Sequence, residues 1–287
     1  MNALVAPFDT PFMGRALAEL LLLAAVCGPV GVLVFLRRLA FVADALTHTV
    51  FPGVVLGFLA GGYPGIPAGA LVAALLTAVA VTLLSRRTQL NEDTTIAVLL
   101  TAMFSLGVVL VSRRHSYTSD LTAFLFGRLL TVTPAQLAQT AALAAVVLIL
   151  LAVTARPLIL RAFDPVAAAS AGFRVTLLDL ALNTAIALVV VAAVQAVGTI
   201  LVIALLVVPA AIARLLTDQF APMVLLATAV CGLAGYLGLL ASWTASVQHG
   251  IRLTSASAVV LTLIGCYLLA LAAAAARHRL TNRAARA

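Results

Sequence analysis

One segment of the chain combines a carboxylate, an imidazole and a proline within an otherwise apolar run. In FVADALTHTVFPGVVLG, which starts at Phe41, Asp44 and His48 are four residues apart. Residues four apart share one face of a helix, so a carboxylate oxygen and an imidazole nitrogen there could hold one divalent ion. An aspartate near mid-membrane costs about 2.5–3.5 kcal/mol to insert, so it usually has a partner or a function. We therefore predict a metal site at this pair.

Pro52 and Gly53 follow the pair directly. Proline has no backbone N–H, so the carbonyl four residues earlier, that of His48, loses its helical partner. We therefore predict a helix kink at Pro52 that leaves a backbone oxygen beside the two side chains. Gly53 and Gly57 would let a neighbouring helix approach closely.

The spacing also leaves a second interpretation open, because Asp-x-x-x-His is a weak motif. Asp44 could lie solvated at the cytoplasmic interface of the membrane, close to Arg37 and Arg38, while His48 contacts a neighbouring helix. In that case the two side chains would have a structural role.

A second polar feature interrupts a long apolar run. The stretch QAVGTILVIALLVVPAAIARLLTD begins at Gln195, and it carries Pro209, Arg214 and Asp218 after the apolar residues. We predict that residues 209–222 form an amphipathic interruption with a short helix at the cytoplasmic face, a coupling segment that could dock on a soluble partner. A plain loop is the alternative interpretation.

Membrane helices must position these residues. The chain has 287 residues, is 64% hydrophobic and 9% charged, and has a mean hydropathy of +1.21. A helix that crosses the hydrocarbon core needs about 20 apolar residues. We predict spans near 17–36, 41–59, 66–84, 94–111, 134–153, 223–240 and 257–276. The run 177–208 is too long for one span, and Gln195 and Gly198 divide it, which gives eight or nine spans in total.

The net charge of +8 comes from 17 arginines, most of which follow the ends of apolar runs. This pattern is typical of membrane topology and does not indicate nucleic-acid binding. If nine spans are counted, one side of the membrane receives most of the arginines, and we expect that side to be cytoplasmic. It holds Arg37, Arg38, Arg86, Arg87, Arg156, Arg161, Arg174, Arg214 and the tail. The other side holds Arg113, Arg114 and Arg128.

We expect one transmembrane domain over 1–287, with an interfacial lead-in at 1–16 and a basic cytoplasmic tail at 277–287. The three cysteines lie in apolar runs without metal-site spacing. The phosphate-binding loop of nucleotide hydrolases requires a lysine, and the chain has none. We therefore expect no enzyme activity and no permanently bound cofactor, and ATP hydrolysis would need another polypeptide.

Together these motifs resemble the ABC-3 family, the permeases of bacterial zinc, manganese and iron importers. The resemblance is carried, in order along the chain, by PFMGRAL at 11–17, Arg38 followed by FVADALTHTVFPGVVLGFLAGG, Glu92-Asp93, Leu125-Phe126-Gly127, Phe163-Asp164-Pro165, and VGTILVIALLVVPAAIARLLTD at 197–218. It covers nearly the whole chain at matching spacing.

The resemblance implies an all-α polytopic permease, similar to those of type II ABC importers, in a bacterial plasma membrane. It implies passage of zinc, manganese or iron through a permease dimer, here a homodimer, with membrane lipid around it. Two cytoplasmic ABC ATPases would use the ATP, and an extracytoplasmic metal-binding protein would deliver the ion. Asp44 and His48 would contact the metal, and Pro209, Arg214 and Asp218 would belong to the ATPase-docking segment.

Some positions depart from the family pattern. Thr47 stands where serine is usual, Ala97 where glycine is usual, and QHGIRLTS at 248–255 where proline and glycine are frequent. Alternative functions are a permease of the same fold for a metal chelate or haem, and an ion-coupled secondary carrier. A carrier would work without an ATPase, and the sequence shows no inverted repeat to support one. An intramembrane enzyme has no supporting motif.

Overall fold

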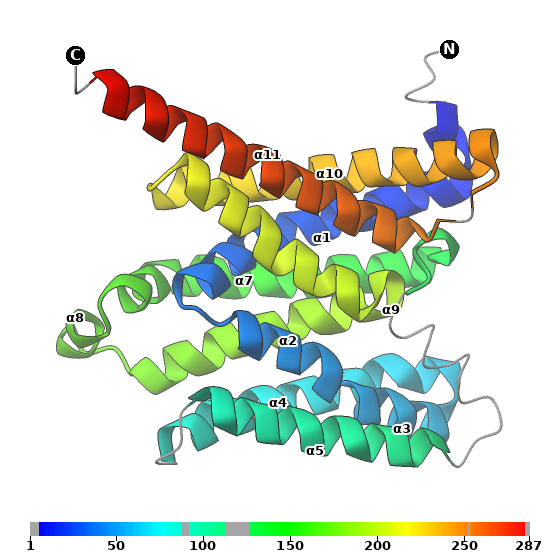
Figure 1. The fold of residues 1–287 in the computed structure, drawn as a ribbon. Coiled ribbons are helices and arrows are strands. Elements are labelled where there is room, and N and C mark those ends of the chain that lie inside the picture. The colour runs from blue at the N-terminus through cyan, green and yellow to red at the C-terminus, as the bar shows by residue number, and fades with distance from the viewer. Residues whose placement is uncertain (1–5, 88–91, 113–126, 252, 285–287) are drawn as a thin grey trace.

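The computed structural model describes residues 6–87, 92–112, 127–251 and 253–284. Over these ranges the chain is helical, with short connections and no β-strand (Figure 1). The α-helices are α1 (Pro11–Leu36), α2 (Ala40–Thr49), α3 (Phe51–Gly61), α4 (Ile66–Arg87), α5 (Glu92–Ser112), α7 (Pro134–Phe163), α8 (Pro165–Ser170), α9 (Val175–Leu216), α10 (Phe220–His249) and α11 (Ser255–Ala284). Short 3-10 helices are η1 (Ala6–Asp9), η2 (Tyr63–Gly65) and η3 (Leu129–Thr131). The predicted all-α fold is confirmed.

Eight helical stretches of the described chain are long and apolar enough to cross a membrane. One of them, Ala40–Gly61, combines α2 and α3, which are separated at Val50. The seven predicted single spans each fall inside one of these stretches. The eighth stretch is α9, which corresponds to the long run that the sequence divides in two.

Gly198 divides α9 into two segments. Its backbone has φ 76° and ψ 166°, a conformation open almost exclusively to glycine. Figure 1 shows the chain reversing there, so that the segments 175–197 and 199–216 run in opposite directions. Gln195 lies inside the first segment, so the break itself is at Gly198. Counting both segments, the eight stretches supply nine apolar segments.

Contacts with α1 require this reversal. Asp179, near the start of α9, forms an ion pair with Arg37, and the Leu206 carbonyl lies against Gly31. Arg37 and Gly31 are about 9 Å apart along α1, whereas a straight helix would separate Asp179 from Leu206 by about 40 Å. The two segments of α9 must therefore pack side by side against α1.

The reversal brings both ends of α9 to one side of the molecule. The ends of α1, α4, α7 and α11, the start of α10 and the short helix α8 lie on that same side (Figure 1). Arg37 and Arg38 directly follow α1, Arg174 precedes α9, and Arg214 lies in its last turn. The positive-inside rule assigns this arginine-rich side to the cytoplasm.

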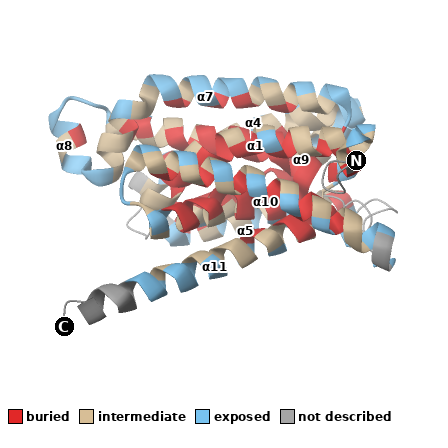
Figure 2. Ribbon diagram, turned by 90° about the horizontal axis from the view of Figure 1, so that it is seen from above, coloured by how far each residue is buried: buried red, intermediate tan, exposed pale blue. Residues whose placement is uncertain are grey.

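The core of the molecule is built around α9 and α1. In α9, 83% of the most apolar window is buried, whereas in α11 the share is 17%. Figure 2 shows the same contrast, with buried residues along α1 and α9 and exposed ones along α11. The exposed apolar side chains of α11 are therefore suited to contact lipid, and α9 is the scaffold on which the other helices pack.

The N-terminal and C-terminal boundaries differ from the prediction. Helix α1 begins at Pro11, so the second part of the expected lead-in at 1–16 is the first turn of a span. Proline suits that position because its missing N–H would have no helical partner there. At the other end, α11 continues to Ala284, so most of the expected tail at 277–287 prolongs a helix.

The expected separate short helix after Pro209 is absent from the described chain. Helix α9 continues through Pro209 to Leu216, and α10 begins at Phe220. Neighbouring helices can stabilise a proline inside a membrane helix, so it need not end one.

Candidate metal site

Helix α2 carries the predicted metal pair. The Asp44 Oδ1 and His48 Nε2 atoms are 3.6 Å apart, as expected for residues one helical turn apart. Their side chains are 37% and 26% exposed, respectively. Both groups are therefore reachable from outside the chain while remaining partly covered by its helices.

Helix α5 covers one side of the pair. The imidazole of His48 meets the ring of Phe104 edge-on, with centroids 5.7 Å apart, and Phe104 also contacts Phe51 at 5.7 Å. The Thr47 hydroxyl donates a 2.7 Å hydrogen bond to the backbone carbonyl of Asp44, and not to its side-chain carboxylate. An aromatic wall thus borders the imidazole, while the Asp44 side chain remains 37% exposed.

The helix break beside the pair lies at Val50, two residues before Pro52. Pro52 is buried at the second position of α3, so the His48 carbonyl has no helical N–H partner from it. The Val50 N–H points back toward that carbonyl. The separation of α2 from α3 thus lies within one helical turn of Pro52.

Close helix packing fixes the outer part of this span. A side chain on Gly53 would collide with the Gly69 carbonyl of α4, and one on Gly57 with the Gly65 carbonyl. The backbones of α3 and α4 touch at these glycines, as predicted for Gly53 and Gly57. The break at Val50 is thereby held between α2 and a tightly packed α3–α4 pair.

The chain supplies two strong ligands at this place. Across the residues that the structure describes, no group of three or more His, Cys, Asp or Glu side chains could hold a metal ion. A closed structural zinc site has four ligands, whereas a site that releases its ion needs open positions. The pair can bind an ion only with further ligands from water, backbone or another chain.

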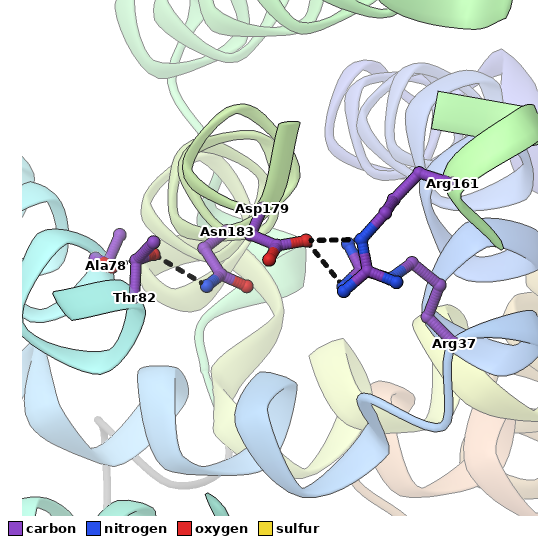
Figure 3. A network of polar contacts seen from close by, with 6 residues as sticks. All are labelled: Arg37, Ala78, Thr82, Arg161, Asp179 and Asn183. Carbon is purple, nitrogen blue, oxygen red and sulfur yellow. Dashed lines mark hydrogen bonds and ion pairs between the residues drawn. The ribbon is translucent and has the colours of Figure 1, made fainter. Parts of the chain in front are cut away.

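A polar network lies at the arginine-rich end, close to the start of α2 (Figure 3). Asp179 Oδ1 is 2.6 Å from Arg37 Nη2 and 3.3 Å from Arg161 Nε. The three side chains are between 11% and 19% exposed. They join the α1–α2 connection, the end of α7 and the start of α9.

The network continues one turn further along α9. Asn183 donates a 2.9 Å hydrogen bond to the Thr82 hydroxyl of α4, which in turn donates to the Ala78 carbonyl at 2.7 Å. Figure 3 shows Asp179 and Asn183 next to each other on α9, with Thr82 on one side of them and the two arginines on the other. One face of α9 therefore ties four helices together beside the helix that carries Asp44 and His48.

The predicted coupling residues lie at the connection between α9 and α10. Pro209 is buried within α9, while Arg214 Nη1 and Asp218 Oδ1 form a 2.9 Å ion pair with 41% and 88% exposed side chains. Such an exposed pair adds little to stability. Its two charged groups are accessible at the cytoplasmic side.

The sequence analysis missed two acidic residues, the buried Glu19 and the partly buried Asp179. Glu19 on α1 is fully buried and accepts a 2.8 Å hydrogen bond from the Thr140 hydroxyl of α7. An acidic residue inside an apolar run is the signal that could have identified both, because such residues seek partners in the bundle interior. Their partners lie far away in sequence, so only the fold reveals them.

The fold and the site define a polytopic helical membrane protein with a polar pair at a broken span. The model of the ABC 3 transport family matches residues 9–274. The chain therefore belongs to the ABC 3 transport family.

Individual proteins agree with this assignment. The chain is 35% identical over 252 residues to the manganese transport system membrane protein MntC of Halalkalibacterium halodurans, covering 88% of this chain and 86% of that protein. It is 36% identical over 239 residues to the chelated iron transport system membrane protein YfeD of Yersinia pestis, covering 83% and 79%. The solved structure of PsaBC from Streptococcus pneumoniae in complex with Fab superposes with a TM-score of 0.80 at 29% identity, covering 93% and 94%.

Proposed function

We propose that this chain is the membrane-spanning permease subunit of an ATP-driven importer for a divalent transition metal. The observation that carries the proposal is the Asp44–His48 pair beside the break at Val50, within a chain of this family. A carboxylate and an imidazole suit manganese, zinc and iron, because imidazole favours transition metals over magnesium and calcium. The names of the similar proteins favour manganese, with iron as the next candidate.

The proposed importer has partners on both sides of the membrane. Two cytoplasmic ABC ATPases supply the ATP hydrolysis for which this chain lacks a lysine-containing phosphate loop. An extracytoplasmic binding protein delivers the ion, and a second copy of this chain completes the pathway. Two ligands from each copy would give the ion four, and two positions of an octahedral manganese ion would stay open to water.

The coupling role falls to the α9–α10 connection in this proposal. Arg214 and Asp218 present exposed charges next to a short turn, and Pro209 lies five residues before Arg214 in α9. A surface loop without a partner would tolerate charge reversal there. A docking segment would not, because rim charges guide association.

Reconstituted transport tests the proposal against its alternatives. Liposomes that contain this chain, its ATPase and its binding protein should accumulate radioactive manganese only when ATP is present. Uptake by the chain alone, driven by a proton or sodium gradient, would instead identify an ion-coupled carrier. Uptake of a metal chelate or haem without uptake of the free ion would identify a chelate permease.

A further inference from the structure

Glu19 is an acidic side chain in the interior of the bundle, where α1, α7 and α9 pack against one another. Its Oε1 atom accepts the 2.8 Å hydrogen bond from the Thr140 hydroxyl. The Oε2 atom is buried as well, and it has no hydrogen-bond partner among the described residues. Because buried polar atoms normally have a partner, this oxygen is available to a further ligand.

The helices that pack against α1 carry no charged side chain at the depth of Glu19. Glu19 lies about 12 Å from the start of α1, in the half of the span that is remote from the arginine-rich side. Residues 134–155 of α7, 180–213 of α9 and 220–248 of α10 contain no Asp, Glu, Lys or Arg. An ionised carboxylate without a countercharge is unfavourable in such surroundings, so it takes up a positively charged partner.

The charged residues nearer the outer end of the bundle form no ion pair with Glu19. They are Arg15 on α1, Asp9 in η1 and Arg128, which precedes η3. None of the ion pairs between described residues includes Glu19. Arg15 lies one turn before Glu19, yet its buried Nε atom also has no hydrogen-bond partner among the described residues. The positive charge must therefore come from a bound ion.

The polar groups around Glu19 offer oxygen atoms to such an ion. The Thr140 hydroxyl lies 2.8 Å from Glu19 Oε1 and 3.4 Å from the carbonyl oxygen of Ala192. Thr140 also lines a cavity of about 10 Å³ between α7 and α9, close to the space that one water molecule needs. The other polar residues that line this cavity are Gln136, Gln139 and Gln195. Oxygen ligands suit hard cations, and one carboxylate balances one positive charge.

We propose that Glu19, Thr140 and the Ala192 carbonyl form a binding site for one small monovalent cation, which is a sodium ion or a proton. A sodium ion would contact the free oxygen of Glu19 and the Thr140 hydroxyl oxygen. A proton would be held on Glu19, which would then donate to Thr140 while the Thr140 hydroxyl donates to the Ala192 carbonyl. Either cation neutralises the carboxylate and joins α1, α7 and α9. The site is separate from Asp44 and His48, and it does not depend on which metal the importer carries.

The thermal midpoint of the purified full-length protein tests this site, because a ligand that binds only the folded chain raises the midpoint. One series replaces choline chloride with sodium chloride at constant ionic strength and pH, and a second series lowers the pH without sodium. We expect a rise of about 3 °C for each tenfold increase in the cation above its dissociation constant. A response in the first series identifies sodium, and a response in the second series alone identifies a proton.

Matched variants assign the response to Glu19. Glu19→Gln keeps the shape of the side chain and removes its charge, so the response that identifies the cation should be lost. Asp9→Asn makes the same change at an exposed residue of η1 and should respond like the wild type. Equal responses of Glu19→Gln and the wild type in both series would overturn the inference.

Direct observation of the wild-type protein keeps the test decisive if Glu19→Gln does not fold. At neutral pH the wild-type protein should retain one radioactive sodium ion per chain, or else show the infrared carbonyl band of a protonated carboxyl group. A wild-type protein that shows neither the sodium ion nor the band would overturn the inference.

Discussion

In the proposed function, Asp44 and His48 would offer a passing ion one oxygen and one nitrogen ligand from each copy of the chain. Their spacing predicted a shared helical face, and the 3.6 Å separation agrees with that geometry. The aromatic wall at Phe104 could not be predicted, because its contact with His48 depends on how α2 and α5 pack. At this scale the sequence predicted the pair and its spacing, and the fold supplied its surroundings.

The two ion pairs of Asp179 allow us to predict which of two substitutions destabilises the protein more. Asp179→Asn leaves Arg37 and Arg161 facing each other, mostly buried and without their shared carboxylate. Breaking a buried pair in this way costs about 3 kcal/mol. Arg161→Gln leaves one arginine with one aspartate, and it should cost about 1 kcal/mol. The thermal midpoint of the detergent-solubilised protein measures both, and equal losses would contradict this charge balance.

At the scale of elements, the packing of α3 on α4 can be tested with a single methyl group. A Cβ at Gly69 would collide with the Gly53 carbonyl, whereas one at Gly61 meets nothing within 4 Å. Overpacking at such contacts costs about 1–3 kcal/mol. Gly69→Ala should therefore lower the thermal midpoint, and Gly61→Ala should leave it nearly unchanged. If both variants melt like the wild type, the two backbones do not touch.

The reversal of α9 depends on Gly198 in a different way. Its φ of 76° and ψ of 166° exclude other residues at a cost of about 1–3 kcal/mol. Gly198→Ala should lower the yield of folded protein in membranes, since the two segments of α9 would no longer align. Gly265→Ala in α11 is the control, because a Cβ there meets nothing within 4 Å. Normal yield and thermal midpoint for Gly198→Ala would contradict the reversal.

Element boundaries show where reading the sequence succeeded and where it did not. Gly198 was predicted to divide the long apolar run, because a glycine beside a polar Gln195 suggests a break. Pro209 was interpreted in the same way, yet α9 continues through it. The difference is physical, since proline keeps helical φ values and loses one hydrogen bond, whereas Gly198 adopts a backbone conformation that no helix contains.

At the scale of the whole molecule, arginine placement predicted the topology. With the reversal counted, the arginine-bearing ends of α1, α7 and α9 meet on one side, as the nine-span interpretation expected (Figure 1). The buried contact between Glu19 and Thr140 spans 121 positions in sequence. No local pattern encodes such a partner, because it arises from the packing of α1 against α7. The apolar runs and the arginines therefore predict how the spans are arranged. Polar contacts between residues far apart in sequence can be identified only from the fold.

The central claim is that Asp44 and His48 hold the transported metal. Cellular manganese uptake by Asp44→Asn and His48→Ala, at equal membrane levels, tests it most directly. Asp44→Asn keeps the side-chain size and removes the charge that attracts a divalent ion. Asp9→Asn, the same change at an exposed residue of η1, serves as the control.

We predict that both site variants lose uptake by about tenfold or more, since changes even in the outer shell of metal sites cost 10–100-fold. The Asp9→Asn control should transport like the wild type. Near-normal uptake by both site variants would contradict the account, leave the pair with a structural role and move the metal path to another part of the chain.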